Sequence, residues 1–203
     1  LKNIIIDDQT KIKIWKVTLG ELSHNELNNE DKELLKIKRS DLLREQFLAT
    51  RKMLALENSD YKITYDLVGK PNLNNEYNIS ISHSHELVAF VISDNCKVGI
   101  DVQLIENKIF KIQHKFLNPP EKLNIGENPS LKILTMIWTS KESIYKAIGI
   151  KGISFSENIK IDGVVEKDKT AQGYYINGAE KVKFDLKFFY IDEYIICYAH
   201  QSL

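Results

Sequence analysis

The hydrophobic pattern along the chain has two periods, which predicts a mixture of helices and strands. Apolar residues recur at a spacing near 3.6 over 31–57 and from Leu131 to Gly149, as in amphipathic helices. A shorter helical pattern ends at Phe116. Strand-like patterns, rich in alternating or β-branched residues, occupy 11–17, 61–67, 78–82, 86–93, 96–102, 158–165, 173–176, 182–191 and 194–200.

The order of these elements favours the α+β class. The strands follow one another without βαβ alternation, which argues against a doubly wound sheet. We expect a hairpin of strands 86–93 and 96–102 about Asp94-Asn95, and turns at Asn177-Gly178 and Asp192-Glu193. The proline-rich stretch 117–130 is predicted to be mostly loop. A helix followed by antiparallel strands thus occurs twice.

Composition narrows the class of protein. The 203 residues carry 28 Lys+Arg and 28 Asp+Glu, so no overall field attracts nucleic acid or anionic lipid. No apolar run approaches the length of about 20 residues that a membrane-spanning helix needs. Cys96 and Cys197 form no CxxC motif, and we expect buried free thiols. These features predict a cytoplasmic protein that binds neither nucleic acid nor membrane.

The strand around Asp101 carries the first chemical signal. Asp101 and Gln103 face one side, opposite Ile100 and Val102, and Gly99 on the polar side leaves room for a ligand or another backbone. A carboxylate at the end of an apolar strand needs hydrogen-bond donors, a cation or a metal ion. Backbone donors of a turn and a bound Mg²⁺ both meet that need.

The helix before Gly149 carries the second signal. Glu142 and Lys146 lie four residues apart and therefore share one face. Such a pair is often a surface ion pair that stabilises the helix by a few tenths of a kcal/mol. The alternative is a carboxylate and an ammonium aimed together at a metal-bound phosphate.

Two further stretches offer groups that suit phosphate oxygens. Ser80, Ser82 and Ser84 share one face of an extended segment, and His83 and His85 share the other. A zinc site at the two histidines lacks a third ligand at a recognisable spacing, and no nucleophile elbow surrounds the serines. In G-K-P at 69–71, the proline restricts Lys70 to extended conformations.

These motifs occur in a characteristic order: G-K-P at 69–71, S-H-S at 82–84, G-I-D-V at 99–102, and W-T-S-K-E-S-I-Y-K-A-I-G at 138–149. Together they resemble the 4′-phosphopantetheinyl transferases, in particular the longer, pseudo-dimeric class typified by the enzyme that activates surfactin synthetase. The resemblance covers residues 30 to 150. Such enzymes move the phosphopantetheine arm of coenzyme A onto a serine of an apo carrier protein and release adenosine 3′,5′-bisphosphate.

The resemblance implies roles for the acidic and basic residues. Asp101 and Glu142 would bind Mg²⁺ on the pyrophosphate of coenzyme A, and Glu142 would also draw the proton from the carrier serine. Lys146 would neutralise charge on the phosphates, with Lys141 assisting. Many relatives have an acidic residue where this chain has Gln103, whose amide oxygen would ligate the metal or a coordinated water.

The nucleotide end of coenzyme A would be bound by Lys70, Ser82 and His83. Lys32 is expected to reach the 3′-phosphate, in competition with two further lysines, Lys36 and Lys38. Glu121 resembles another acidic position of the family, suited to act as a base or to support the metal ligands.

The resemblance also implies an architecture and a partner. Two similar α+β lobes related by a pseudo-two-fold axis, 1–104 and 105–203, would each pack a helix on an antiparallel sheet and hold coenzyme A between them. A monomer would bind an apo acyl or peptidyl carrier protein near 118–130. Two alternatives remain: a non-catalytic coenzyme A-binding protein of the same fold, and an unrelated interaction domain that does not bind coenzyme A.

Overall fold

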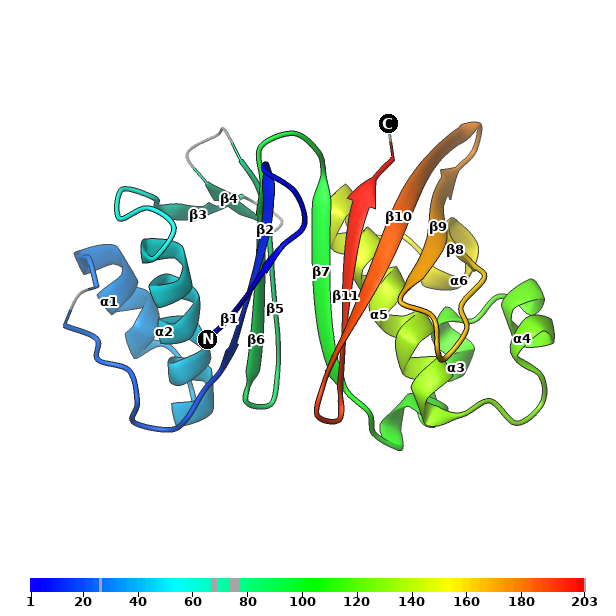
Figure 1. The fold of residues 1–203 in the computed structure, drawn as a ribbon, viewed down its shortest axis with the longest axis horizontal. Helices are drawn as coiled ribbons and strands as arrows, with labels where there is room; N and C mark the ends of the chain where they lie inside the picture. Colours follow the sequence, from blue (N-terminus) through cyan, green and yellow to red (C-terminus); the bar gives the residue numbers. More distant parts are fainter. Residues whose placement is uncertain (26, 67–68, 74–76, 203) are drawn as a thin grey trace.

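The computed structural model describes residues 1–25, 27–66, 69–73 and 77–202 (Figure 1). It confirms the α+β class, since helices accompany sheets whose strand pairs are antiparallel. Within these residues, no helix is both long and apolar enough to cross a membrane. Cys96 and Cys197 are free thiols, with Cys197 buried and Cys96 partly exposed.

The first sheet has two helices beside it. Its strands follow the order β1 (Lys2–Ile5), β2 (Thr10–Lys16), β6 (Leu87–Ser93) and β5 (Asn78–Ser84). The helices are α1 (Asn29–Lys36) and α2 (Asp41–Ala55), and a separate two-stranded ribbon consists of β3 (Ile63–Tyr65) and β4 (Pro71–Leu73).

The second sheet contains most of the remaining chain. Its strands follow the order β7 (Val98–Leu104), β11 (Tyr194–Gln201), β10 (Glu180–Ile191), β9 (Thr170–Asn177) and β8 (Ile159–Asp162). The helices are α3 (Lys108–Phe116), α4 (Pro119–Ile125), α5 (Leu131–Ile148) and α6 (Phe155–Asn158). The tight connections after Asn177 and Ile191 confirm both predicted turns.

Three hydrophobic clusters make a layered core, with helices outside and the two sheets between them (Figure 1). One cluster packs α2 on the first sheet through residues such as Met53 and Phe90. A second joins the two sheets, for example Val91 with Ile196. The third packs α5 on the second sheet. The pseudo-two-fold relation and the division at residue 104 stay predictions.

Two of the predicted local structures are wrong. The helix predicted over 31–57 is two helices, because Ser40 takes an extended conformation and its hydroxyl caps α2 at the N–H of Leu43. The stretch 117–130 contains α4, which starts at Pro119 after a capping box between Asn118 and Glu121. Proline suits the first turn of a helix, so it marks a beginning here rather than a break.

The predicted hairpin of β6 and β7 is also wrong. β6 lies inside the first sheet between β2 and β5, whereas β7 crosses to the second sheet and pairs with β11. The segment around Asp94-Asn95 therefore connects the two sheets. This crossing places Asp101 of β7 against α5 and next to β5.

Candidate functional site

The two sheets meet at a seam between β5 and β7, the facing edge strands. Backbone pairing does not join them; instead, three serine hydroxyls of β5 accept hydrogen bonds from backbone N–H groups of β7. The pairs are Ser80 with Ile100, Ser82 with Val102 and Ser84 with Leu104, at N···O distances of 3.1, 3.2 and 3.3 Å. The hydroxyls of these serines are engaged with β7, and Ser80 also borders a cavity beside Lys70 and Lys146.

Asp101, Ser82 and Lys146 form a compact polar cluster at this seam. The Lys146 ammonium lies 2.7 Å from Asp101 Oδ1 and 2.9 Å from Ser82 Oγ. The Ser82 hydroxyl donates to the same Asp101 Oδ1 at 2.7 Å. Asp101 is buried, and the cluster therefore provides the partners that a buried carboxylate needs. Lys146 and Glu142 are thus more than a surface pair.

Glu142 and Gln103 lie beside this cluster. Burial, reinforced by the Asp101 carboxylate, raises the pKa of Glu142 from its ordinary value of 4.5 to about 7. Gln103 Nε2 donates to Asp101 Oδ2 at 3.4 Å. Two carboxylates that repel each other and a nearby amide match the oxygen ligands that Mg²⁺ prefers, with phosphates and water completing the set. The described residues contain no group of three His, Cys, Asp or Glu poised to hold a metal.

Gly99 brings β7 and α5 close enough to assemble this cluster. A Cβ at this position would lie 1.9 Å from the carbonyl oxygen of Ser143 and 2.9 Å from the backbone nitrogen of Ala147. The room left by Gly99 is therefore filled by the backbone of α5. Because α5 lies directly on β7, Lys146 and Glu142 reach Asp101.

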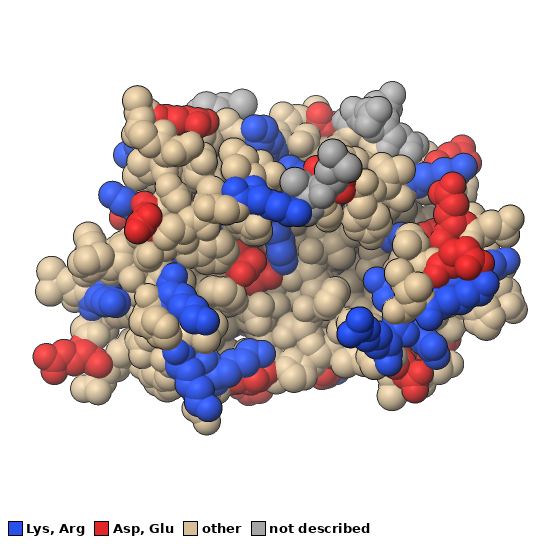
Figure 2. All heavy atoms as spheres, turned by 180° about the vertical axis from the view of Figure 1, so that it is seen from behind, with Lys and Arg blue, Asp and Glu red and all other residues tan. Residues whose placement is uncertain are grey.

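The first sheet with α1 and α2 forms one half of the molecule, and the second sheet with α3 to α6 forms the other. Lys70 faces the end of α5 across a cleft between these two halves. Its Nζ donates to the carbonyl oxygen of Ala147 at 3.3 Å, and burial followed by the charge of Lys97 lowers its pKa. A cavity of about 190 Å³ lies here, bordered by Gly69–Pro71 and by Lys146 and Lys151. Seen from behind, the molecule is hollowed between its halves, with basic and acidic side chains at the rim (Figure 2).

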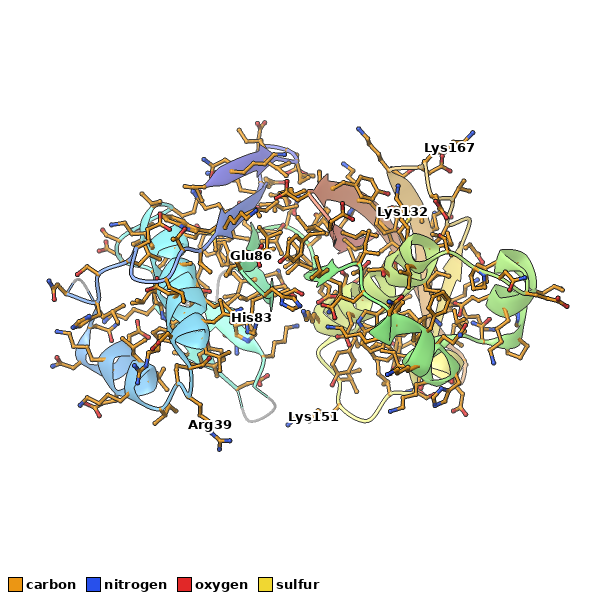
Figure 3. All side chains as sticks on the ribbon, turned by 90° about the horizontal axis from the view of Figure 1, so that it is seen from below. Arg39, His83, Glu86, Lys132, Lys151 and Lys167 are labelled. Atoms are coloured by element: carbon orange, nitrogen blue, oxygen red, sulfur yellow. The ribbon has the colours of Figure 1, made fainter. Side chains whose placement is uncertain are left out.

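His83 borders an adjacent cavity of about 220 Å³ that is also lined by Gly69 and Pro71. From below, His83 lies on the side of the first half that faces Lys151 (Figure 3). Burial, followed by the charges of Lys146 and Lys38, lowers the pKa of His83. Lys38 lines the same cavity, and among the described residues that line it there is no carboxylate.

Arg51 is a residue of this cavity that sequence reasoning missed, although Arg44 and Arg51 are seven residues apart on one helix. Its Nε pairs with Asp31 Oδ1 at 2.8 Å, and its guanidinium stacks on Phe47. Nη1 and Nη2 are buried and have no hydrogen-bond partner in the described part of the chain. Buried unpaired donors are costly, and an oxyanion would satisfy them.

Lys32 does not share the cavity of His83. It lines a different groove, between α1, α2 and residues 19–24, together with Lys36. The contact of Lys32 with the 3′-phosphate therefore stays a prediction, and it requires a 3′-phosphate outside the cavity of His83. Of the three competing lysines, Lys38 is the one beside His83.

Lys141 and Glu121 form a buried ion pair away from the cleft. The Lys141 ammonium lies 2.8 Å from Glu121 Oε2 and also donates to the carbonyl oxygens of Phe116, Phe155 and Ile159. Its side chain is 0% exposed. Each group is saturated inside the core, so the positions of Lys141 and Glu121 do not support the predicted contact of Lys141 with coenzyme A or the predicted role of Glu121 as a base.

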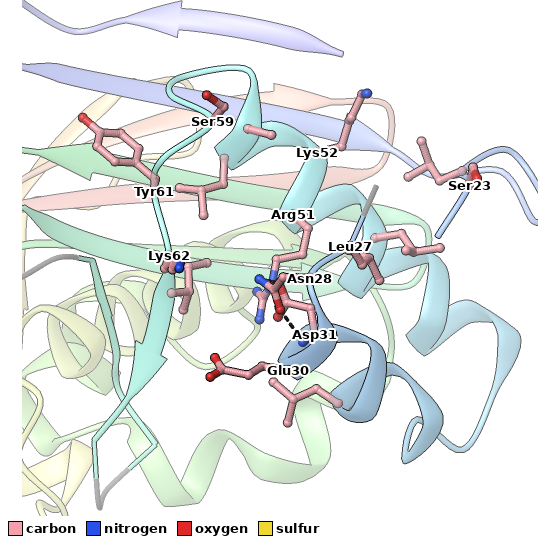
Figure 4. Close-up of a pocket in the computed structure, with 16 residues that line it drawn as sticks. Ser23, Leu27, Asn28, Glu30, Asp31, Arg51, Lys52, Ser59, Tyr61 and Lys62 are labelled. Carbon is pink, nitrogen blue, oxygen red and sulfur yellow. Dashed lines mark hydrogen bonds and ion pairs between the residues drawn. The ribbon is translucent and has the colours of Figure 1, made fainter. Parts of the chain in front are cut away.

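A further cavity of about 280 Å³ lies between α1, α2 and residues 59–63 (Figure 4). The Arg51–Asp31 ion pair borders it, together with the acidic Glu30. It is lined by residues of the first half only, so it does not contain the cluster around Asp101.

The arrangement defines a class of site. A buried carboxylate, a second carboxylate of raised pKa and an ammonium lie on facing elements beside a cleft with basic residues. These groups suit transfer of a phosphoryl group with a divalent cation, which needs positioning and charge stabilisation rather than a covalent nucleophile.

Comparison with known proteins identifies the family. Residues 97–199 match the 4′-phosphopantetheinyl transferase superfamily, and the chain belongs to it. Over 100 residues it is 33% identical to the 4′-phosphopantetheinyl transferase gsp of Aneurinibacillus migulanus. That alignment covers 48% of this chain and 42% of the relative, so the chain spans less than half the length of this curated relative.

Proposed function

We propose that this protein transfers the 4′-phosphopantetheine arm of coenzyme A to a serine of an apo acyl or peptidyl carrier protein. The serine oxygen forms a new bond to phosphorus, the pyrophosphate bond breaks, and adenosine 3′,5′-bisphosphate leaves. The observation that supports this most is the meeting of Asp101, Glu142 and Lys146 at the seam between the two sheets. Two of the motifs that resemble the family, those at 99–102 and 138–149, thus lie next to each other.

The metal site would consist of Asp101, Glu142 and the amide of Gln103. Mg²⁺ bound there would neutralise the pyrophosphate and polarise its bonds. Lys146, within hydrogen-bond distance of Asp101, supplies positive charge where charge develops on the phosphates. Glu142, with a pKa near neutrality, is suited to accept the proton of the carrier serine, directly or through a water.

Coenzyme A would cross the cleft between the halves, with its pyrophosphate near Lys70 and Lys146. Its nucleotide end would occupy the cavity of His83, where Lys38 and the free amino groups of Arg51 suit the 3′-phosphate. A ligand that spans both cavities would contact both halves of the chain. We further propose that these halves are the two pseudo-symmetric lobes of the longer class, acting as a cytoplasmic monomer.

The carrier protein would dock on α3 and α4, beside α5. Leu123 of α4 is 81% exposed and Phe110 of α3 is 40% exposed. Exposed lysines flank these two apolar side chains: Lys111, Lys115 and Lys122. Exposed apolar and basic side chains on these helices would suit a carrier with acidic helices.

Mass spectrometry of apo carrier proteins incubated with this protein, coenzyme A and Mg²⁺ tests the proposal. We expect a gain of the phosphopantetheine mass on the carrier serine, lost on addition of EDTA. Asp101→Ala and Glu142→Ala should abolish the gain while both variants stay folded. Coenzyme A binding without a mass gain on any carrier would instead support a non-catalytic coenzyme A-binding protein.

A further inference from the structure

The hydroxyl of Ser82 has no hydrogen-bonding capacity left for a ligand. A serine hydroxyl has one proton to donate and two lone pairs to accept with. Ser82 donates to Asp101 Oδ1 at 2.7 Å and accepts from Lys146 Nζ at 2.9 Å and from the N–H of Val102 at 3.2 Å. The contact of Ser82 with coenzyme A stays a prediction, and it requires one of these three bonds to be exchanged for the ligand.

The two oxygens of Asp101 have different surroundings. Oδ1 receives both the Ser82 hydroxyl and the Lys146 ammonium, at 2.7 Å each. Oδ2 has one partner in the described part of the chain, the Gln103 amide at the longer distance of 3.4 Å. The carboxylate is thus held by one oxygen, while the other is weakly engaged and free to bind a cation.

Ser82 also connects the Asp101 carboxylate to both strands of the seam, since Ser82 lies on β5 and accepts a hydrogen bond from the backbone of β7. The same hydroxyl that holds Oδ1 accepts the N–H of Val102, the residue next to Asp101. The neighbouring Ser84 accepts the equivalent bond from the N–H of Leu104, at 3.3 Å, and among the described residues its hydroxyl makes no hydrogen bond with Asp101 or Lys146. The two serines therefore share the structural contact and differ in the carboxylate contact.

We propose that Ser82 is a positioning residue that orients the Asp101 carboxylate so that Oδ2 faces the divalent cation. This inference rests on the proposed function, since it concerns the metal of that reaction. Groups that hold a metal-binding carboxylate in place commonly contribute tenfold or more to metal affinity or activity, by orienting the ligand before the metal arrives. Without the hydroxyl, the carboxylate can turn toward Lys146 with both oxygens.

The test compares Ser82→Ala with Ser84→Ala, each of which removes one hydrogen bond from the β7 backbone, while Ser82→Ala also removes the contacts with Asp101 and Lys146. Mn²⁺ affinity is measured by electron paramagnetic resonance with coenzyme A present, and the Mg²⁺ concentration for half-maximal transfer is measured separately. We expect Ser82→Ala to weaken Mn²⁺ binding and to raise the Mg²⁺ requirement about tenfold. Ser84→Ala should stay within about twofold of the wild type, because its contact is structural only.

Two controls separate positioning from folding. Thermal unfolding should show both alanine variants folded at the assay temperature, with the larger loss in Ser82→Ala because Asp101 and Lys146 also lose a partner. Ser82→Thr, which keeps the hydroxyl, should restore most of the Mn²⁺ affinity. Equal Mn²⁺ affinities in the two alanine variants would overturn the proposal, as would a wild type that binds no Mn²⁺ with coenzyme A. Failure of phosphopantetheine transfer with intact Mn²⁺ binding would refute the proposed function and leave the role of Ser82 standing.

Discussion

The buried pair of Lys141 and Glu121 gives a prediction that separates a structural role from a role in coenzyme A binding. Lys141→Met replaces the ammonium with an apolar side chain of similar length. It leaves the Glu121 carboxylate, which is 4% exposed, without its cation. Three backbone carbonyls, those of Phe116, Phe155 and Ile159, lose a donor at the same time.

The expected loss of stability is large. Removing one partner of a buried ion pair typically costs about 3 to 5 kcal/mol, because the other charge remains buried. Glu121 keeps hydrogen bonds from the N–H groups of Asn118 and Ile161, at 3.0 and 2.9 Å, which favours the lower end of that range. Domains are stable by about 5 to 15 kcal/mol, so the variant loses a substantial part of the total.

Urea unfolding followed by tryptophan fluorescence measures this loss where it occurs. The Trp138 ring lies 5.2 Å from Phe116 and 5.5 Å from Phe155, whose carbonyls both accept from Lys141. With a urea dependence of about 3 kcal/mol/M, the midpoint should fall by about 1 M or more. The exposed Lys160→Met on β8 is the matched control and should change stability by less than about 0.5 kcal/mol.

A second variant checks the cause of the loss. Lys141→Met combined with Glu121→Gln removes both charges and should recover part of the stability, because no uncompensated carboxylate remains. If Lys141→Met unfolds at the wild-type urea concentration but binds coenzyme A weakly, the assignment to the core is refuted. A ligand contact at the phosphates would then be the better interpretation.

Three other perturbations have definite outcomes. Gly99→Ala should destabilise the protein by about 3 kcal/mol and stop transfer, because its Cβ would lie 1.9 Å from the carbonyl oxygen of Ser143. Urea unfolding and transfer assays check this, and a variant that is both stable and active would contradict it. The pKa of Glu142 is raised to about 7 in the folded protein, whereas in the unfolded chain it has the ordinary value of 4.5. Between these two pH values the folded metal-free protein keeps a proton on Glu142 that the unfolded chain has released. The free energy of unfolding should therefore fall by about 2 kcal/mol as the pH rises from 4.5 to 7, after allowance for partial exposure. Glu142→Gln, measured in EDTA, should lack this dependence. If the free energies of unfolding of the wild type and the variant change with pH in parallel, the prediction is refuted. Gln103→Glu adds a third carboxylate and should lower the Mg²⁺ concentration for half-maximal transfer, whereas an unchanged requirement argues against a ligand at this position.

The pattern of apolar and polar residues along the chain determined most of the helices and strands, and the sequence motifs indicated the residues of the site. Period and stop signals located α5, whose C-cap Gly149 has a left-handed conformation, and alternation located the strands of both sheets except β1. The ordered motifs placed Asp101, Glu142 and Lys146 in one functional group before their distances were known. The helices and strands depend on residues close together in the chain, so the sequence alone carries them, whereas the grouping of Asp101 with Glu142 rests on the family resemblance.

The tertiary structure decided which side chains are available to a ligand. As candidate binding residues, Ser82, Lys141 and Lys32 looked equivalent to Lys70 and His83. In the structure, Ser82 is hydrogen-bonded at the seam, Lys141 is hydrogen-bonded in the core, and Lys32 lines a separate groove. The seam exists because β7 pairs with β11 rather than β6, which buries Val98, Ile100 and Val102 in the cluster that joins the two sheets. A hydrogen-bonding group serves a ligand only if no closer partner has already satisfied it, and those partners come from distant parts of the chain.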